Sequence, residues 1–496
     1  MSPEPPCPSC RKIPAALFLL AVLGGLIACT LSGIPAPAPP VTLASFPTEV
    51  PLPAEGSLPE ISPEVPHYFL HLRVDPSASL VVGHEVVRYT NLEEVSLRDL
   101  YLRLFPNTPG YGGRMRVMNL TLNGLPVSPE VRLGGSALRL LLHPPLAPLQ
   151  TVTLTMEFTA SVPLTDAVDF AQFAYLGGVM ALPNVYPMIP VYDDEGWNVE
   201  IAPDYGDAVY SDIAVYRVEV TAPPTMTLAA TGTCTTDKPG AWRCEAERVR
   251  DFVLILGENY ETLSQRVDGV WVNSYFYPAD RDGGAQALRV AGNALTLYSR
   301  LFGPYPYGEL DIVETPTRAG GIEYPTLVVI SDRLYAGHPR LEWVVAHEVA
   351  HQWWYGVVGN DQVDEPWLDE ALTQYSTFLY HEFLYGPEVA AEVFQREFQD
   401  PYDRLVRAGE DMPPGLPVAA YPPGLYGTVV YRKGALYFHA LRQRVGDEKF
   451  FAVLRAYYRR HQFGIATPES LLEAIQAVTG DAQRDLYDRW ILGKSG

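Results

Sequence analysis

The sequence predicts an α+β protein with an all-β first half and a mainly α second half. Two features of the chain predict this class. Between residues 64 and 264, short stretches of alternating apolar and polar residues are separated by turn residues, as in β-strands. From residue 265 to residue 496, longer stretches carry apolar residues at helical spacing. The 496 residues exceed what one ordinary core accommodates, so we expect more than one domain.

The individual elements follow from the same patterns. Strands of the first domain are expected at residues 67–74, 80–89, 100–105, 138–142, 152–158, 213–220 and 252–256. One further strand pair, 270–277 and 310–313, is expected to flank a helix over 286–302. The remaining helices are expected at 341–355, 367–383, 387–398, 431–445, 448–461 and 468–478. The boundary between the domains is therefore placed at residue 264.

The first 63 residues are expected to serve export rather than folding. Arg11 and Lys12 precede an apolar run of about 16 residues, which fits a signal peptide and is short for a spanning helix. The run ends in Leu26-Ile27-Ala28-Cys29, which resembles a bacterial lipobox. We therefore expect residues 1–28 to be removed and Cys29 to carry a lipid that anchors the chain to the outer face of the membrane. An ordinary signal peptide and an uncleaved anchor are the alternatives. The Pro-rich residues 29–63 are expected to form a tether.

Charge and cysteine content limit the partners and the compartment. The net charge of −22 argues against nucleic acid as a partner, because phosphate binding needs a basic face. Cys234 and Cys244 are ten positions apart, with Pro239-Gly240 between them. In an oxidising compartment, this spacing fits a disulfide across a hairpin. Two free buried thiols are the alternative.

Residues 347–351 read His-Glu-Val-Ala-His and lie in a stretch that is expected to be helical. Histidines four positions apart share one helix face, so His347 and His351 can bind the same metal ion. Glu348 then lies beside the ion, where a general base is needed. A catalytic zinc ion takes three protein ligands and keeps one position for water. A helix with two structural histidines is the alternative.

Glu370 is the expected third ligand. Asp364-Glu365-Pro366-Trp367 looks like a helix start with Asp364 as the N-cap, which places Glu370 one turn into a second helix. Eighteen residues separate His351 from Glu370. They leave room for the first helix to end near Gly356 and for the second helix to return antiparallel. This glutamate favours a metal site over structural histidines.

Three segments together resemble the aminopeptidase N and leukotriene hydrolase family of gluzincin peptidases. The first is the metal motif followed by Trp367-Leu368-Asp369-Glu370-Ala371-Leu372. Gly320-Gly321-Ile322-Glu323-Tyr324 is similar to the family's G-x-M-E-N segment, whose glutamate binds the free α-amine of the substrate. The stretch from Tyr426 through Tyr431 to Gly434 is similar to Y-x4-Y-x-K-G, whose second tyrosine stabilises the oxyanion. The resemblance covers residue 64 to the end and implies a saddle-like all-β domain followed by a thermolysin-like catalytic domain.

The resemblance implies an aminopeptidase that acts on peptides and holds one Zn2+ per chain at the three expected ligands. Zinc lowers the pKa of bound water to about 7 and polarises the scissile carbonyl. Glu348 would accept the water proton and pass it to the leaving amine, and Tyr431 would stabilise the oxyanion. The expected substrate-binding residues are Gly320, Gly321, Glu323 and Tyr426.

The sequence departs from the family pattern at the amine site. The family's β domain provides a glutamine or glutamate upstream of a P-C-x-D segment, whose place Pro190-Val191-Tyr192-Asp193 takes here. Val179 and Ala181 occupy the upstream positions. Asp193-Asp194-Glu195 is a candidate substitute, and a solvated acidic loop is the alternative. The chain ends soon after Ile491, so an open cleft without the helical C-terminal domain of large members is expected. An endopeptidase with the same site and a non-catalytic binding protein are the other functions considered.

Overall fold

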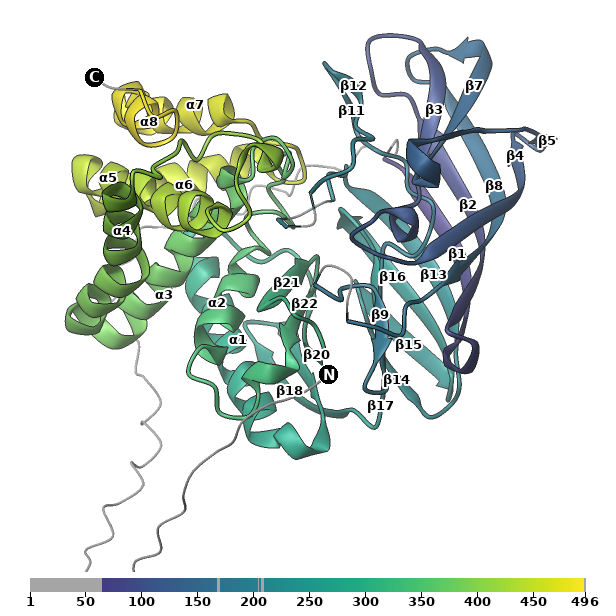
Figure 1. Ribbon diagram of the computed structural model, residues 1–496, viewed down its shortest axis with the longest axis horizontal. Helices are drawn as coiled ribbons and strands as arrows, with labels where there is room; N and C mark the ends of the chain where they lie inside the picture. The colour runs from purple at the N-terminus through teal and green to yellow at the C-terminus, as the bar shows by residue number, and fades with distance from the viewer. Residues whose placement is uncertain (1–64, 167–169, 204, 207–208, 495–496) are drawn as a thin grey trace, which may run out of the picture. The chain divides into compact units, whose positions relative to one another are not determined.

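The computed structural model describes residues 65–166, 170–203, 205–206 and 209–494. The expected signal peptide, the tether and Cys29 lie outside these residues. No helix within the described ranges is long and apolar enough to cross a membrane. Figure 1 shows a β-rich first half, coloured purple to teal, and a largely helical second half, coloured green to yellow.

An eight-stranded sheet is the largest element of the first half. Strand β1 (His67–Asp75) pairs antiparallel with β2 (Leu80–Thr90) and parallel with β13 (Ala214–Thr221). Alternate side chains of β1 and β2 are buried. This alternation is the signature that predicted the strands, because one face of the sheet packs on the core. In spatial order the strands are β15 (Thr233–Lys238), β16 (Ala241–Val249), β13 (Ala214–Thr221), β1 (His67–Asp75), β2 (Leu80–Thr90), β8 (Thr151–Ser161), β4 (Arg114–Leu122) and β5 (Leu125–Pro126).

Three smaller sheets complete this half, and one apolar core joins most of them. That core includes Leu70 of the large sheet, Leu100 of the three-stranded sheet and Leu254 of the four-stranded sheet, all fully buried. The four-stranded sheet has the order β14 (Met226–Ala230), β17 (Val253–Glu258), β10 (Val179–Pro183) and β9 (Ala174–Leu176). The others are β3 (Leu97–Arg103), β7 (Ala137–Leu146) and β6 (Glu130–Arg132), and the pair β11 (Tyr192–Asp193) and β12 (Gly196–Trp197).

Cys234 and Cys244 form a disulfide. They lie directly opposite each other in the hairpin of β15 and β16. The bond therefore joins two neighbouring strands at the edge of the large sheet.

The second half begins with a five-stranded mixed sheet where the sequence indicated only one strand pair. Its order is β18 (Glu261–Val267), β19 (Val270–Phe276), β20 (Glu309–Thr315), β22 (Leu327–Ser331) and β21 (Gly321–Tyr324). Because β18 spans the expected boundary at residue 264, the change of architecture lies just before it. Helix α1 (Arg281–Leu301) packs against β18, β19 and α2 (Leu341–Ala350).

The helices differ from the expected ones at several ends, and two of them, over residues 400–408 and 484–490, were not expected. Helix α3 (Trp367–Phe394) joins two expected helices and bends at Gly386, whose φ of 83° is non-helical. The prediction that Asp364 is the N-cap is wrong, because α3 begins at Trp367 without a side-chain cap. The backbone N–H of Asp364 instead donates a hydrogen bond to the carboxylate of Asp361. A π-helical segment, η8 (Gly427–Lys433), leads into α5. The remaining helices are α4 (Asp400–Ala408), α5 (Gly434–Val445), α6 (Asp447–His461), α7 (Pro468–Thr479) and α8 (Arg484–Trp490).

Arg250 connects the two halves. Its side chain is 2% exposed and donates hydrogen bonds to the carbonyl oxygens of Ser211 at 3.0 Å, Tyr355 at 2.7 Å and Gly464 at 2.5 Å. A β-carbon on Gly359 would lie 2.1 Å from the guanidinium carbon, so glycine is required there. The loop after α2 is thereby fixed to the β-rich half.

Candidate metal site and cleft

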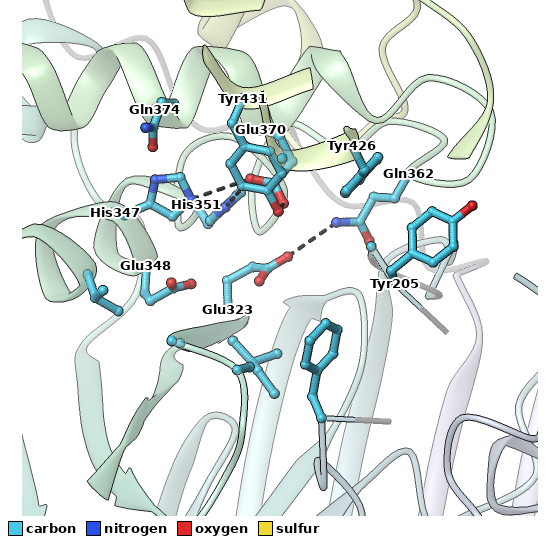
Figure 2. Close-up of a pocket in the computed structure, with 18 of the residues that line it drawn as sticks. Tyr205, Glu323, His347, Glu348, His351, Gln362, Glu370, Gln374, Tyr426 and Tyr431 are labelled. Carbon is cyan, nitrogen blue, oxygen red and sulfur yellow. Dashed lines mark hydrogen bonds and ion pairs between the residues drawn. The ribbon is translucent and has the colours of Figure 1, made fainter. Parts of the chain in front are cut away.

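Helix α2 carries the two histidines and the glutamate of the motif, and all three side chains are buried. His347 and Glu348 lie in its last turns, and His351 is its C-cap. Nearly the whole helix is buried, since it packs against α1, α3, β21 and β22. Figure 2 shows the imidazoles of His347 and His351 converging on Glu370, while the Glu348 carboxylate lies to one side.

Glu370 from α3 brings a carboxylate between the two histidines. Its Oε2 lies 3.4 Å from Nε2 of His347 and 3.4 Å from Nε2 of His351. This oxygen is buried, and no donor of the described part of the chain forms a hydrogen bond with it. The three ligand atoms lie within 4.8 Å of one another. Two imidazoles and one carboxylate are a donor set that zinc accepts in catalytic sites, so these residues fit such an ion.

Two threonines of α3 and one carbonyl orient the imidazoles. Nδ1 of His351 lies 3.0 Å from the carbonyl oxygen of Trp354, which can only accept, so Nδ1 carries the proton. The hydroxyl of Thr377 donates to the carbonyl of Thr373 at 2.9 Å, and its oxygen can then accept from Nδ1 of His347 at 3.3 Å. Thr373 also lies 3.2 Å from Nδ1 of His351. Both Nε2 lone pairs are thus left for a metal ion. The sequence analysis did not identify either threonine. Their helical spacing from Glu370, which places them on the same helix face, could have indicated them.

The carboxylate of Glu348 rests against the backbone of Gly321. A β-carbon there would lie 2.4 Å from Oε1 of Glu348, whereas one on Gly320 would make only an ordinary 3.7 Å contact with Val344. Burial raises the pKa of the Glu348 carboxyl well above its usual value, and the His351 charge opposes this. Gly321 therefore leaves the space that Glu348 occupies.

Glu323 lies on the edge strand β21 and faces the same cavity. Gln352, which follows the motif, accepts a bond from the backbone of Thr326 at 2.8 Å and donates one to the carbonyl of Tyr324 at 2.9 Å. These bonds fix the strand relative to the metal site. Gln362 donates to Oε1 of Glu323 at 3.3 Å, and burial raises the pKa of the Glu323 carboxyl (Figure 2). The carboxylate is thus held by an amide, and no lysine or arginine of the described ranges pairs with it.

Asp251 is a second carboxyl group on this side of the cavity. It is 0% exposed, and its Oδ2 accepts a hydrogen bond from the Tyr355 hydroxyl at 2.9 Å. Its Oδ1 has no hydrogen-bond partner in the described ranges. Burial raises its pKa to about 7, and the Glu323 charge adds to the rise. No motif in the sequence pointed to Asp251, which reaches the site from the loop before β17.

The acidic segment proposed to substitute for the missing amine partner lies elsewhere. Asp193, Asp194 and Glu195 belong to the β11–β12 hairpin and line a different cavity. None of the three lines the cavity that contains the metal site. Asp251, and not this segment, lines the cavity that contains the metal site.

Tyr431 approaches the metal site from η8. Its hydroxyl donates a hydrogen bond to Oε1 of Glu370, and its ring stacks on His347 with centroids 5.9 Å apart. Tyr426 meets Tyr431 edge to face at 5.8 Å and also contacts the ring of Tyr205. The expected metal ligands, catalytic residues and substrate-binding residues line one cavity of about 570 Å³, whereas the acidic segment 193–195 does not. The hydroxyl of Tyr431 thus lies one hydrogen bond from Glu370, the expected third ligand.

Comparisons with known proteins agree with this geometry. Residues 286–490 match the model of the peptidase family M1 domain. Over 236 residues, the chain is 28% identical to aminopeptidase M1 of Arabidopsis thaliana. The matched segment covers 45% of this chain and 27% of that relative. Over 188 residues, the chain is 30% identical to aminopeptidase B of Rattus norvegicus, covering 35% and 28%. The matched segments thus span little more than a quarter of these relatives.

A solved structure shows that the fold is shared over both halves. The M1 zinc metallopeptidase from Deinococcus radiodurans superposes with a TM-score of 0.65 at 22% identity. The match covers 86% of this chain and 93% of that one. The expected fold class, a β-rich domain followed by a mainly helical domain, is confirmed.

Proposed function

We propose that this chain, which carries a peptidase family M1 domain, is a zinc-dependent peptidase that removes N-terminal residues from peptides. The observation that carries the proposal is the convergence of three ligand atoms, the Glu348 carboxylate and the Tyr431 hydroxyl on one cavity. The relatives named above as aminopeptidases support the same reaction.

The side chains divide the hydrolytic work between them. His347, His351 and Glu370 would hold one zinc ion, which supplies an acidified water and polarises the substrate carbonyl. Glu348, whose buried carboxyl has a raised pKa, takes the proton from the water and gives it to the leaving amine. The hydroxyl of Tyr431 donates a hydrogen bond to the oxygen that becomes negative.

Recognition of the free amine is assigned to two carboxylates. Glu323 and Asp251 line the same side of the cavity, and the unpartnered Oδ1 of Asp251 provides the acceptor that Val179 and Ala181 cannot provide. An α-ammonium group placed between the two carboxylates would neutralise their mutual repulsion. Its charge would also draw the raised pKa of Asp251 back down, so both groups ionise when a substrate binds.

Hydrolysis of matched peptides tests the proposal. A zinc-loaded preparation is expected to release the first residue from a free-amine peptide, to lose this activity with a chelator and to regain it with added zinc. The Glu348→Gln variant, with zinc content checked, is expected to retain almost no turnover. Equal cleavage of the N-acetylated peptide would indicate the endopeptidase alternative instead. Retained turnover in Glu348→Gln would reject the assigned base.

The N-terminal sequence supports a further proposal about location. The lipobox-like Leu26-Ile27-Ala28-Cys29 follows an apolar run, so we propose that Cys29 carries a lipid and holds the chain on the outer face of the bacterial membrane. The full chain expressed in a bacterium is expected to incorporate labelled fatty acid and to partition into detergent. Cys29→Ala is expected to abolish both, and an unlabelled wild-type chain would reject the lipid anchor.

A further inference from the structure

Two arginines line the cavity that contains the metal site. Arg340 immediately precedes α2, and Arg432 follows Tyr431 in η8. Among the described residues that line this cavity, they are the only cationic side chains apart from the metal-site histidines.

Arg432 has an uncompensated charge. Its half-buried guanidinium makes no hydrogen bond or ion pair with any residue in the described ranges. Glu397, the acidic group whose charge acts on Arg432, is already shared, because it pairs with Arg340 at 3.6 Å and with Arg396 at 2.8 Å. The pKa of Arg432 is lowered by burial and by the charges of Arg340 and Arg404, while Glu397 opposes the shift. A partly buried guanidinium without a carboxylate partner is a favourable receptor for an anion.

The arginines and the amine-binding carboxylates lie toward opposite ends of α2. Arg340 lies at the N-terminal end and its charge acts on His347, whereas the Glu323 charge acts on His351 at the C-terminal end. The metal site lies between them. A peptide whose α-amine meets Glu323 would therefore extend past the metal site toward the arginines.

We propose that Arg432, assisted by Arg340, binds the C-terminal carboxylate of short peptide substrates. Seven helical residues place Arg340 about 10 Å from His347 along the helix axis. An extended peptide advances about 3.3 Å per residue. The long arginine side chains reach back toward the metal site and cover the rest of this distance. The substrates are therefore di- and tripeptides, whose carboxylate lies one or two residues beyond the cleaved bond. The inference rests on the proposed function and names its substrate class.

Paired peptides that differ only at the carboxylate test the proposal. Wild-type enzyme is expected to cleave Ala-Phe with a kcat/KM on the order of tenfold above that for Ala-Phe amide, as for a charge-assisted hydrogen bond. In Arg432→Gln this ratio is expected to fall to about one. Arg404→Gln removes an exposed charge that acts on Arg432 but does not line the cavity, and it is expected to keep the wild-type ratio. A ratio near one in the wild type, or an unchanged ratio in Arg432→Gln, overturns the proposal.

Two more measurements are needed. One tests whether the arginines bind the terminal carboxylate or an acidic side chain of the peptide, and the other tests carboxylate binding independently of hydrolysis. Ala-Glu amide and Ala-Gln amide are expected to be cleaved equally; a preference for Ala-Glu amide without one for Ala-Phe would overturn the terminal-carboxylate assignment. Calorimetry with Glu348→Gln is expected to show tighter binding of Ala-Phe than of its amide, and Arg432→Gln in this background is expected to abolish the difference. If binding shows the preference but no peptide is cleaved, the carboxylate site stands and the hydrolytic function fails. Equal binding of both peptides overturns the carboxylate site.

Discussion

Replacement of Gly321 with alanine is expected to displace the carboxylate of Glu348 and to lower turnover without unfolding the chain. The new β-carbon would lie 2.4 Å from Oε1 and 2.5 Å from Cγ of Glu348. Non-bonded heavy atoms need about 3.5 Å, so the side chain has to move by roughly 1 Å. Misplacement of a reacting group by this distance lowers the rate on the order of 100-fold.

A glycine outside the cavity provides the control. A β-carbon on Gly308 would meet no atom within 4 Å, and Gly308 does not line the cavity, so Gly308→Ala is expected to keep a kcat close to the wild-type value. The assay is kcat for release of the first residue from a free-amine peptide, with zinc content and unfolding temperature measured for each variant. Gly321→Ala enzyme with full zinc content and a wild-type kcat would refute the reasoning, because Glu348 would then tolerate displacement.

Three further predictions concern groups around the site. Thr377→Val removes the hydroxyl that can accept from Nδ1 of His347, and is expected to weaken zinc binding by about 10- to 100-fold in a competition with a chelator, with Thr377→Ser restoring it. Burial raises the pKa of Asp251 from 3.8 to about 7, so the folded state binds more protons than the unfolded state between these values. Stability contributed by this group is therefore present below about pH 4 and is lost as pH rises to 7, by roughly 4 kcal/mol at most. Asp251→Asn is expected to flatten this part of the stability profile in chemical denaturation; an unchanged slope would contradict the buried, protonated carboxyl. Arg250→Met leaves several buried carbonyl oxygens without a donor and is expected to lower the unfolding free energy by about 3 kcal/mol or more, measured in urea. A loss below about 0.5 kcal/mol would show that other contacts hold the halves together.

Features that depend on residues close in sequence could be predicted from the sequence. His347 and His351 share a helix face wherever that helix lies, so their convergence needed no tertiary information. Four strands of the large sheet, β1, β2, β8 and β13, were predicted, since burial of one face imposes alternation on them. The other four strands, β4, β5, β15 and β16, were not predicted. The short edge strand β21 has no such alternation, and only its resemblance to a family segment drew attention to Glu323.

Features that depend on distant contacts could not be predicted. Asp251 and Tyr355 are far apart in the chain and meet only because the β-rich half packs against the loop after α2. In the sequence, Arg432 resembles an ordinary surface arginine. Only the structure shows that it lines the cavity and pairs with no acidic residue of the described part of the chain. The expected cap at Asp364 failed because Asp361 forms the local turn in its place.

Helix α3 holds the third ligand and both threonines on consecutive turns of one face. Glu370, Thr373 and Thr377 therefore keep a fixed register with respect to one another, and any rotation of α3 moves all three together. A shift of the helix therefore changes the geometry of the metal site as well. Zinc affinity should then report on the packing of α3 as a whole, so that a remote substitution which turns this helix would weaken metal binding without altering any ligand.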